Sequence, residues 1–499
     1  MFFKRFFIQI LVFFIVSGIF FPSLLQAQTS VRDVTLNEVI QLAREQSLQA
    51  ILAKHQFRAD YWEFRSYKAK YLPNITLRSQ FPQFRRAIKE YQNPDGSYKY
   101  IEDNVNTSSL NVDISQNIGL TGGRLFVSSD LQRIDQFGDN TRHSYMSTPV
   151  SIGYNQPVLF FNEYKWEKQI EPLKYEQARK EYLSGLEEST IRAVNYYFDL
   201  ILAQKNLEIA NSNYANADTL YTISQKRYQI GTIAENELMQ MKLSYLNAGA
   251  DLNDARINLR AARIRLRSFL GFNENVELHL KEPSDIPNID IEVSRAVDLA
   301  EENNPQIIDY EKQLLQVKRD VAQAKSEKGP NASLFASFGL TQEARELANV
   351  YENPQNQQRL TLGFEIPIVD WGLGKGRYKM AQSRQQMVQT DIQRSRQEFE
   401  QNVGLRVMKF NLQDDQVEVK YQAELTAQKR YDITKKRFLV GKVDVLDLNV
   451  ASSEKDVAKR NYISTLRNYW LDYFEIRQLT LYNFLEDKPL EAEFDSLVK

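Results

Sequence analysis

Cysteine is absent from the 499 residues of this chain, and histidine occurs only three times. Without cysteine the chain can form no disulfide, no thiolate metal site and no lipid-modified N-terminal cysteine, and it has no cysteine nucleophile. His55, His143 and His279 fall on different predicted elements, so we expect neither a metal site nor a bound cofactor. The net charge of −1 gives no reason to expect nucleic acid as a partner.

Long hydrophobic runs are also missing, with one exception at the N-terminus. Lys4 and Arg5 precede an apolar run over 6–25, which ends in Leu25-Gln26-Ala27. This order predicts a secretory signal peptide over 1–27. An uncleaved anchor is the alternative, because the run approaches the ~20 residues that span a bilayer. We therefore expect an exported mature chain without a membrane-spanning helix.

The residues of a catalytic site are not found either. Gly372-Leu373-Gly374-Lys375-Gly376 lacks the spacing of a phosphate-binding loop, and we interpret it as a strand-to-helix turn. Carboxylates are abundant, but they alternate with lysine and arginine in helical patterns, as on solvated helix surfaces. The sequence predicts no catalytic residue, so we do not expect an enzyme.

A motif near the middle of the chain returns near its end. Residues 221–231 correspond to 431–441, and each copy ends in a glycine between two long helical patterns. After each glycine, apolar residues alternate at spacings of three and four, which predicts a coiled-coil seam. Lys455 and Asp472 are the polar exceptions in the second seam. The first seam comprises Leu238, Met241, Tyr245, Ala248, Leu252, Ala255, Leu259, Ala262, Leu266 and Phe269.

Alternation of apolar and polar residues predicts β-strands before each long helix. In the second copy these are 334–340 and 360–366, and in the first 74–81 and 150–156. The first copy also contains an extra pair, 110–115 and 125–131, joined by Thr121-Gly122-Gly123. We expect exposed loops over 89–107 and 135–146, one continuous helix over 33–70, and a single long helix over 376–440.

These patterns divide the chain into two structural repeats. The first covers 28–290, with strands about 74–156, a long helical hairpin over 160–271 and a short connector over 272–290 with little helix. The second covers 291–485, with strands about 331–367 and a helical hairpin over 374–485. The polar tail, 486–499, is expected to be disordered or to lie on the outside.

Alternating strands on an exported protein are typical of an outer-membrane β-barrel, with the apolar side toward lipid. A bilayer tolerates no open sheet edge, and about eight strands make the smallest useful barrel. One chain offers four strands, or six with the extra pair, so we expect several copies to close the barrel. A soluble β-sandwich attached to a coiled coil is the alternative.

The order of helix, strand pair, long helix, glycine turn and helix, present twice, resembles the TolC family of outer-membrane efflux proteins. The motifs that carry the resemblance are Lys436–Gly441 with Val443–Leu448, Ala300–Pro305 and Pro367–Asp370. The implied fold class is mixed α and transmembrane β, in which a long antiparallel coiled-coil barrel joins a trimeric β-barrel. The family implies 12 barrel strands, whereas the extra pair leaves 12 and 18 open.

The resemblance also implies a function. A homotrimer in the outer membrane of a Gram-negative cell would serve a tripartite efflux or type I secretion system as a passive duct. It would dock on a periplasmic adaptor, which connects it to an inner-membrane transporter. A structural or adhesive coiled-coil envelope protein is the alternative. Asp432 is the expected tunnel-mouth gate. The implied docking residues are Arg227, Tyr228, Ile230, Gly231 and Thr232 in one turn, and Arg437, Phe438, Val440, Gly441 and Lys442 in the other.

Overall fold

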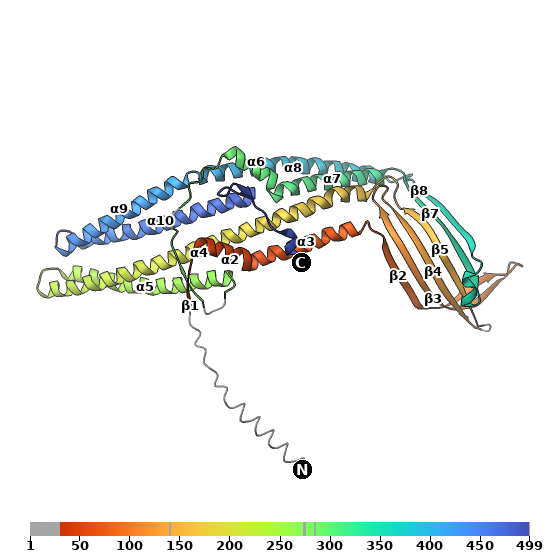
Figure 1. Cartoon of the computed structure of the whole chain (residues 1–499), viewed down its shortest axis with the longest axis horizontal. Coiled ribbons are helices and arrows are strands. Elements are labelled where there is room, and N and C mark those ends of the chain that lie inside the picture. Colours follow the sequence, from red (N-terminus) through yellow and green to blue (C-terminus); the bar gives the residue numbers. More distant parts are fainter. Residues whose placement is uncertain (1–29, 139–140, 273–275, 284–285, 499) are drawn as a thin grey trace, which may run out of the picture. The chain divides into compact units, whose positions relative to one another are not determined.

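A computed structural model of the chain describes residues 30–138, 141–272, 276–283 and 286–498 (Figure 1). The predicted signal peptide over 1–27 lies outside these residues. The chain divides into two compact units. We call Met1–Leu48, Ser189–Ile286 and Asp414–Leu471 the helical unit, and Gln49–Glu188, Pro287–Gln413 and Asp472–Lys499 the sheet unit.

The sheet unit contains one six-stranded antiparallel sheet with the order β2-β3-β4-β5-β7-β8 (Figure 1). The extra pair predicted in the first repeat forms β3 and β4, inside the sheet and hydrogen-bonded on both sides. Within the described residues the chain thus supplies six strands to one sheet. The strands are β2 (Asn74–Gln92), β3 (Tyr98–Ile118), β4 (Gly123–Phe137), β5 (Arg142–Gln156), β7 (Asn331–Ala344) and β8 (Gln355–Glu365).

The strands are longer than predicted, so the expectation of exposed loops over 89–107 and 135–146 was wrong. β2 and β3 continue to a tight turn, where the Asn93 amide donates to the Ser97 carbonyl at 2.8 Å. Polar side chains in this region pair across the strands instead of marking a loop. Arg85 and Lys89 both contact Asp103 at 2.7 Å. Composition alone does not reveal such pairing, because each partner lies on another strand.

The helix predicted over 33–70 is interrupted. The described part of the chain starts with a strand, β1 (Ser30–Val34), which is followed by α2 (Leu36–Gln46) and α3 (Leu48–Ala69), separated by Ser47 in an extended conformation. The second repeat has the same break at Asn304, between α6 (Val293–Asn303) and α7 (Pro305–Lys328). There the cause is local, because a residue before proline is driven out of the helical conformation.

The long helices of the two repeats differ in continuity, and in the second repeat the prediction of one helix was wrong. α4 runs without interruption over Glu163–Gln229. The helix expected over 376–440 is divided into α8 (Leu373–Phe410) and α9 (Gln413–Leu439).

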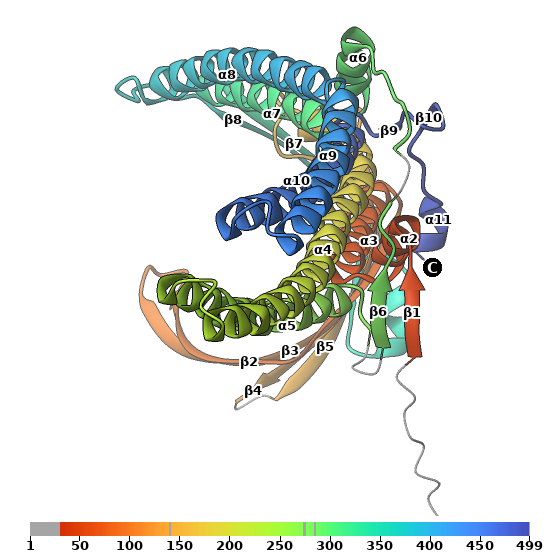
Figure 2. The same cartoon turned by 90° about the vertical axis from the view of Figure 1, so that its left-hand side faces the viewer.

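Two helical hairpins form most of the helical unit (Figure 2). The end of α4 packs on α5 (Glu235–Phe269) through Ala210, Leu252 and Ala255. α9 packs on α10 (Val445–Thr480) through a second apolar cluster. The first predicted seam is the buried side of α5. Its buried members are Leu238, Met241, Leu252, Ala255, Leu259, Ala262 and Leu266.

The connector between the repeats contains a strand that the sequence analysis missed. β6 (Val276–Leu280) pairs in parallel with β1 (Figure 2). Val34 and Leu278 are buried there. Five residues are too few to establish an alternation, so this strand carried no recognisable pattern.

The tail is ordered over 486–498, so the expectation of disorder was wrong, whereas the expected position on the outside is confirmed, since most of these residues are exposed. β10 (Lys488–Pro489) pairs with β9 (Tyr482–Asn483), and α11 (Phe494–Leu497) follows. The ring of Phe494 lies 5.2 Å from that of Phe57, within the apolar core of the sheet unit. A few apolar side chains therefore hold a segment whose average composition is polar.

Candidate channel wall, turns and hairpin junction

The sheet has one apolar and one polar face. Directly paired residues share a face, and the ladder pairs Leu77 with Val112, Ile152 with Phe338, and Leu334 with Leu362. These apolar side chains are largely exposed; Leu362 is 56% and Phe364 71% exposed. The apolar face also carries Ile75, Leu110, Ile114, Leu125, Val127 and Leu360. Side chains of this kind suit contact with lipid.

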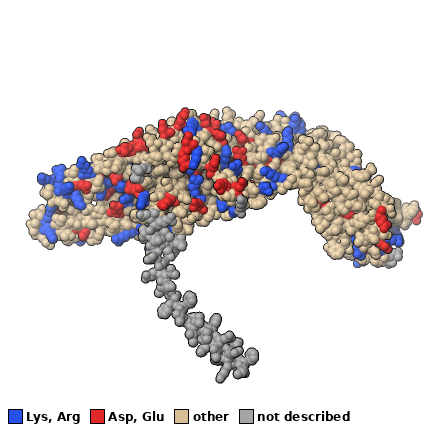
Figure 3. Space-filling view, in the orientation of Figure 1, with Lys and Arg blue, Asp and Glu red and all other residues tan. Residues whose placement is uncertain are grey.

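The opposite face is polar. Asp113 on β3 accepts a hydrogen bond from Arg124 on β4 at 2.6 Å. Phe126 and Phe335 are exceptions and stack on each other with ring centroids 5.9 Å apart. Gly153 makes room for this pair, since a Cβ there would lie 2.3 Å from Phe126 Cζ. In Figure 3 the visible part of the sheet shows few charged side chains. These gather at the end of the strands that lies away from the helices.

Both edges of the sheet are open in the single chain. Within the described residues β2 pairs only with β3, and β8 only with β7. The outer side of each edge strand therefore presents backbone donors and acceptors without a strand partner. Inside a bilayer such groups cost several kcal/mol each when unsatisfied, which requires another strand to cover them.

The two glycine turns have the same geometry and lie at the same end of the helical unit (Figure 1). Gly231 and Gly441 adopt φ of 76° and 73°, a left-handed conformation that favours glycine. In the first turn the Gly231 amide donates to Tyr228 at 3.0 Å and the Thr232 amide to Arg227 at 2.9 Å. The second turn repeats both bonds. Each is a Schellman motif, which satisfies the last carbonyls of the preceding helix.

The predicted docking residues differ in accessibility. Ile230 is 73% exposed, and Val440 is 67% exposed. Phe438 is only 7% exposed, because it packs with Tyr431, Leu448 and Ala451 in the core of the second hairpin. Lysine and arginine gather at this end of the helical unit in Figure 3. The other exposed members of the set are Tyr228, Gly231, Thr232, Arg437, Gly441 and Lys442, and Arg227 is half-buried.

The two turns start their second helices differently. Asp444 caps α10, with its carboxylate accepting from the Asp447 amide at 2.8 Å. Ala234 holds the equivalent position before α5 and has no side chain to cap it. A capping aspartate satisfies an orphan amide and favours the helix start. The first turn therefore lacks the helix cap that Asp444 provides in the second.

Asp432, the predicted gate residue, is exposed on α9. Gln428 donates from Nε2 to both Asp432 carboxylate oxygens, at 3.1 Å and 3.2 Å. Asp432 and Gln428 line a surface cleft on the helical unit. Three lysines, Lys435, Lys455 and Lys459, line the same cleft.

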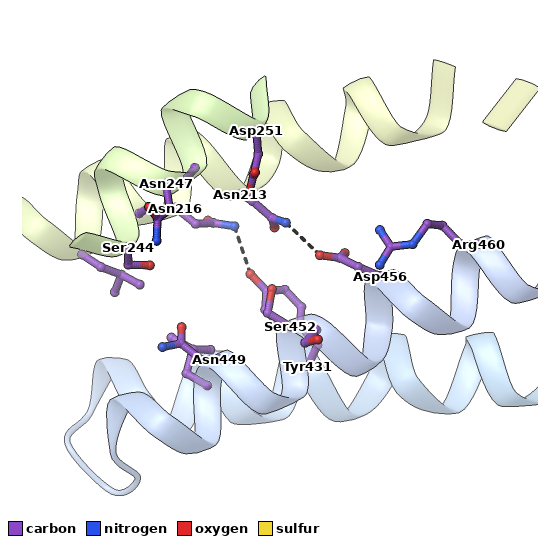
Figure 4. Close-up of a pocket in the computed structure, with 15 residues that line it drawn as sticks. Asn213, Asn216, Ser244, Asn247, Asp251, Tyr431, Asn449, Ser452, Asp456 and Arg460 are labelled. Atoms are coloured by element: carbon purple, nitrogen blue, oxygen red, sulfur yellow. Dashed lines mark hydrogen bonds between the residues drawn. The ribbon is translucent and has the colours of Figure 1, made fainter. Parts of the chain in front are cut away.

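A polar junction between the two hairpins was missed by the sequence analysis (Figure 4). Asn213 on α4 donates to Asp456 on α10 at 2.8 Å, and Asn216 donates to the Tyr431 hydroxyl at 3.0 Å. Lys435 donates to the Asn216 carbonyl oxygen at 3.0 Å. Burial raises the pKa of Tyr431, and the nearby charges of Asp456 and Asp432 raise it further. We call Asn213, Asn216, Tyr431, Lys435 and Asp456 the hairpin junction; it borders a cleft of about 310 Å³.

One signal for this junction was present in the sequence. Lys455 is a polar exception in the second seam; it contacts Asp456 at 3.0 Å, and its Nζ lies 4.5 Å from the Tyr431 ring centroid. The other exception, Asp472, accepts hydrogen bonds from Lys409 at 3.0 Å and Gln413 at 2.9 Å. Polar residues in an apolar seam therefore indicated local networks, although their partners could not be assigned.

His55, His143 and His279 lie on α3, β5 and β6. In the part of the chain that the structure describes, no three potential metal ligands of the His, Cys, Asp or Glu type come together. Among the same residues, no helix combines the length and apolarity needed to cross a membrane.

The sequence profile of one family, described as outer membrane efflux protein, matches residues 39–272 and 296–480. The chain belongs to the outer membrane efflux protein family. This membership makes it a subunit of an efflux channel in the outer membrane, as predicted. A search of curated proteins gave no significant match.

Several solved outer-membrane channels have a similar structure. CmeC of Campylobacter jejuni is 16% identical, with a TM-score of 0.66 over 92% of this chain and 88% of CmeC. MtrE of Neisseria gonorrhoeae, in its open state, is 14% identical, with a TM-score of 0.58 over 92% and 91%. VceC of Vibrio cholerae is 14% identical, with a TM-score of 0.56 over 91% and 97%. These similarities confirm the TolC-like mixed α and transmembrane β fold.

Proposed function

We propose that three copies of the chain form a passive export duct, in which their sheets close one barrel and their hairpins form a periplasmic tunnel. The observation that carries the proposal is a sheet with an apolar face and two open edges. Lipid covers the apolar face, and neighbouring copies cover the edges. The duct performs no chemistry of its own, and cargo reaches it from an inner-membrane transporter.

The glycine turns are the proposed docking surface for a periplasmic adaptor. Ile230 and Val440 present apolar side chains next to arginine and lysine, a combination that suits a partner with an apolar groove and acidic rim. The Schellman bonds hold the backbone of each turn in one conformation, which lowers the entropy cost of binding. Phe438, buried beneath the second turn, supports the docking surface from inside.

Asp432 is the proposed gate residue at the tunnel mouth. Three carboxylates around a threefold axis repel one another and attract cations. The hairpin junction holds α9 against α4 close to this position. Loss of these bonds would let the second hairpin move and the mouth widen.

The oligomer and the duct can be tested on the full chain in detergent and in planar bilayers. We expect a trimeric mass and an ion conductance, together with copurification of an adaptor and a transporter. A stable monomer extracted from the outer membrane, or trimers without conductance, would reject the duct. The second outcome would favour a structural stalk.

Docking is tested with Ile230→Glu and Val440→Glu. Each places a carboxylate on the apolar tip, and we expect copurification of the adaptor to fall while the trimer persists. Gln225→Glu adds the same charge to an exposed position outside the turn and is the matched control. Equal loss in all three variants would point to general charge repulsion instead of docking through the turns.

A further inference from the structure

We infer that the outer-membrane segment is an 18-stranded barrel with a wide exit, formed by six strands from each of three copies. This inference rests on the proposed trimer and goes beyond it, because a trimer with 12 barrel strands would serve as a duct equally well. The question is whether β3 and β4 belong to the wall or form an appendage.

The contacts of β3 and β4 place them in the wall. Their mutual register is unbroken from Asn104–Phe137 to Ile118–Gly123. On its other side β3 pairs with β2 from Ser115 to Tyr98, with one shift, and β4 pairs with β5 from Asn155 to Arg142, also with one shift. An appendage folded over a barrel would leave β2 paired directly with β5. In the described sheet, two further strands separate them.

The side chains of the extra pair continue both faces of the sheet. Leu110, Val112 and Ile114 lie in the apolar face, whereas Asn111 and Asp113 point to the polar side. A hairpin that filled the lumen would have no reason to carry an apolar row. The pattern is that of strands with lipid on one side and water on the other.

The open edges fit each other in direction. Six strands that alternate in direction leave β2 running away from the helix-bearing end of the sheet and β8 running back toward it. β8 of one copy can therefore pair with β2 of the next as an antiparallel neighbour, which continues the pattern around the ring. The exposure of the strands fits this pairing between copies. Nearly every residue of the edge strands β2 and β8 is exposed, whereas β4 and β7, which have a strand on each side, are mostly half-buried.

The strand number sets the width of the exit. With strands about 4.8 Å apart and tilted by about 40°, 18 strands enclose about 36 Å between opposite backbones, against about 24 Å for 12. Barrels of 16–18 strands leave an aqueous channel. An α-helix with side chains measures about 10–12 Å across. The exit thus admits bulky solutes, including polypeptide segments with helical structure, and does not itself select small cargo.

Cysteine cross-linking tests the strand order, and the cysteine-free chain provides a clean background. Leu362→Cys is combined in turn with Ile75→Cys, Leu77→Cys and Ser79→Cys, which covers the possible registers between β8 and the next β2. We expect one combination to link neighbouring copies in the membrane. Val127→Cys with Ile152→Cys, which are direct partners on β4 and β5, should link within one chain.

The discriminating pair is Ile75→Cys with Ile152→Cys, which lie in one row of the sheet through Ile114 and Val127. In the six-stranded sheet these positions are three strand spacings apart, about 14 Å, which is too far for a disulfide. No link is expected within a chain. A link between them would place β2 beside β5 and overturn the 18-stranded barrel, while trimer mass and conductance would still support the duct. Trimers without any β8 to β2 link would overturn it as well.

Polymer exclusion measures the width. Poly(ethylene glycol) of increasing size, added on the extracellular side of the full-length channel in a planar bilayer, lowers conductance only while it enters the exit. Deletion of 98–137 removes β3 and β4, so we expect the exclusion diameter to fall by about one third, in line with the strand count. An unchanged exclusion diameter in a folded deletion variant would show that these strands do not line the exit. If the deletion variant does not fold, the cysteine cross-links described above decide whether β3 and β4 belong to the barrel wall.

Discussion

Asn216 on α4 donates a hydrogen bond from Nδ2 to the hydroxyl of Tyr431 on α9 over 3.0 Å (Figure 4). The Asn216 carbonyl oxygen is held by Lys435, so the orientation of the amide is fixed by both of its ends. This bond joins the two hairpins of the helical unit near their glycine turns. A partly buried bond of this kind contributes about 0.5–1.5 kcal/mol, which is small enough to be broken during opening.

Tyr431→Phe is expected to raise single-channel conductance and leave the fold intact. The variant removes one hydroxyl and keeps the ring in its apolar cluster. The two hairpins therefore lose one hydrogen bond without losing apolar contacts. Planar-bilayer recordings measure the effect. Tyr421→Phe is the control on the same helix, since its ring packs against Tyr462 outside the hairpin junction. An equal change in both variants would indicate that the loss of a hydroxyl on α9, and not the hairpin junction, affects conductance.

Asp432→Asn is expected to increase conductance and reduce preference for cations. Neutralisation removes the three carboxylates that would hold cations at the mouth, and it weakens the charge-assisted bonds from Gln428. Conductance and reversal potential in a salt gradient separate the two effects. Asp415→Asn removes the same charge from another exposed position on α9. If the reversal potential does not move in Asp432→Asn, this carboxylate does not line the mouth.

Asp444→Ala is expected to lower the stability of the second turn by about 0.5–2 kcal/mol, because α10 loses its cap. Ala234→Asp should have the opposite effect on the first turn, where a cap is missing. Hydrogen exchange of the amides at the start of α10 and α5 measures each change locally. Should Ala234→Asp leave the protection of α5 unchanged, the alanine is not what weakens that helix start.

The sequence contained enough information for the elements whose pattern repeats over many residues. The seam through Leu252, Leu259 and Leu266 continues for several heptads, so a single polar residue does not hide it. The alternation of Leu360, Leu362 and Phe364 likewise indicated an apolar face. The glycine turns were visible because a left-handed residue is needed between two long helices.

Features that depend on distant or few contacts could not be predicted in the same way. Asn213 and Asp456 lie in different repeats, and nothing in either local sequence names the other as a partner. β6 is too short for a pattern, and Phe494 anchors the tail through contacts with Phe57 and Tyr182. The long β2–β3 ribbon was mistaken for a loop because its polar pairs satisfy each other across strands.

Acidification is expected to remove an unfavourable interaction of the Glu301 carboxylate in the sheet unit. Burial raises the pKa of Glu301 on α6, and the neighbouring Glu400 on α8 raises it further. A raised folded-state pKa means that the folded chain binds this proton more tightly than the unfolded one. The ionised Glu301 carboxylate therefore lowers the free energy of unfolding above its folded-state pKa. This loss of stability disappears as pH falls below the ordinary glutamate value of 4.5.

Glu400→Gln should thus increase stability by about 0.5 kcal/mol at pH 7, and the gain should disappear as pH falls below 4.5, where the raised pKa of Glu301 no longer costs stability. Denaturant unfolding of the detergent-solubilised protein across this range measures the difference. Glu398→Gln removes the same charge from α8 near Arg394 and should give no gain at pH 7. A gain from Glu400→Gln that persisted at low pH would exclude charge repulsion as its source.

Neighbouring residues of β8 provide a direct test of which face meets lipid. Leu362 lies in the apolar row, whereas Thr361 lies on the opposite face beside Phe335. Leu362→Arg should destabilise the folded barrel by about 2–4 kcal/mol if the residue is near the bilayer midplane, because a charge on the lipid face loses its hydration. Thr361→Arg should change stability little and should alter ion selectivity, since its charge enters the water-filled lumen. Unfolding of the protein in lipid vesicles and reversal potentials in planar bilayers give both readouts. A larger destabilisation from Thr361→Arg than from Leu362→Arg would mean that the polar face contacts lipid. The apolar face would then have to line the lumen, against our assignment.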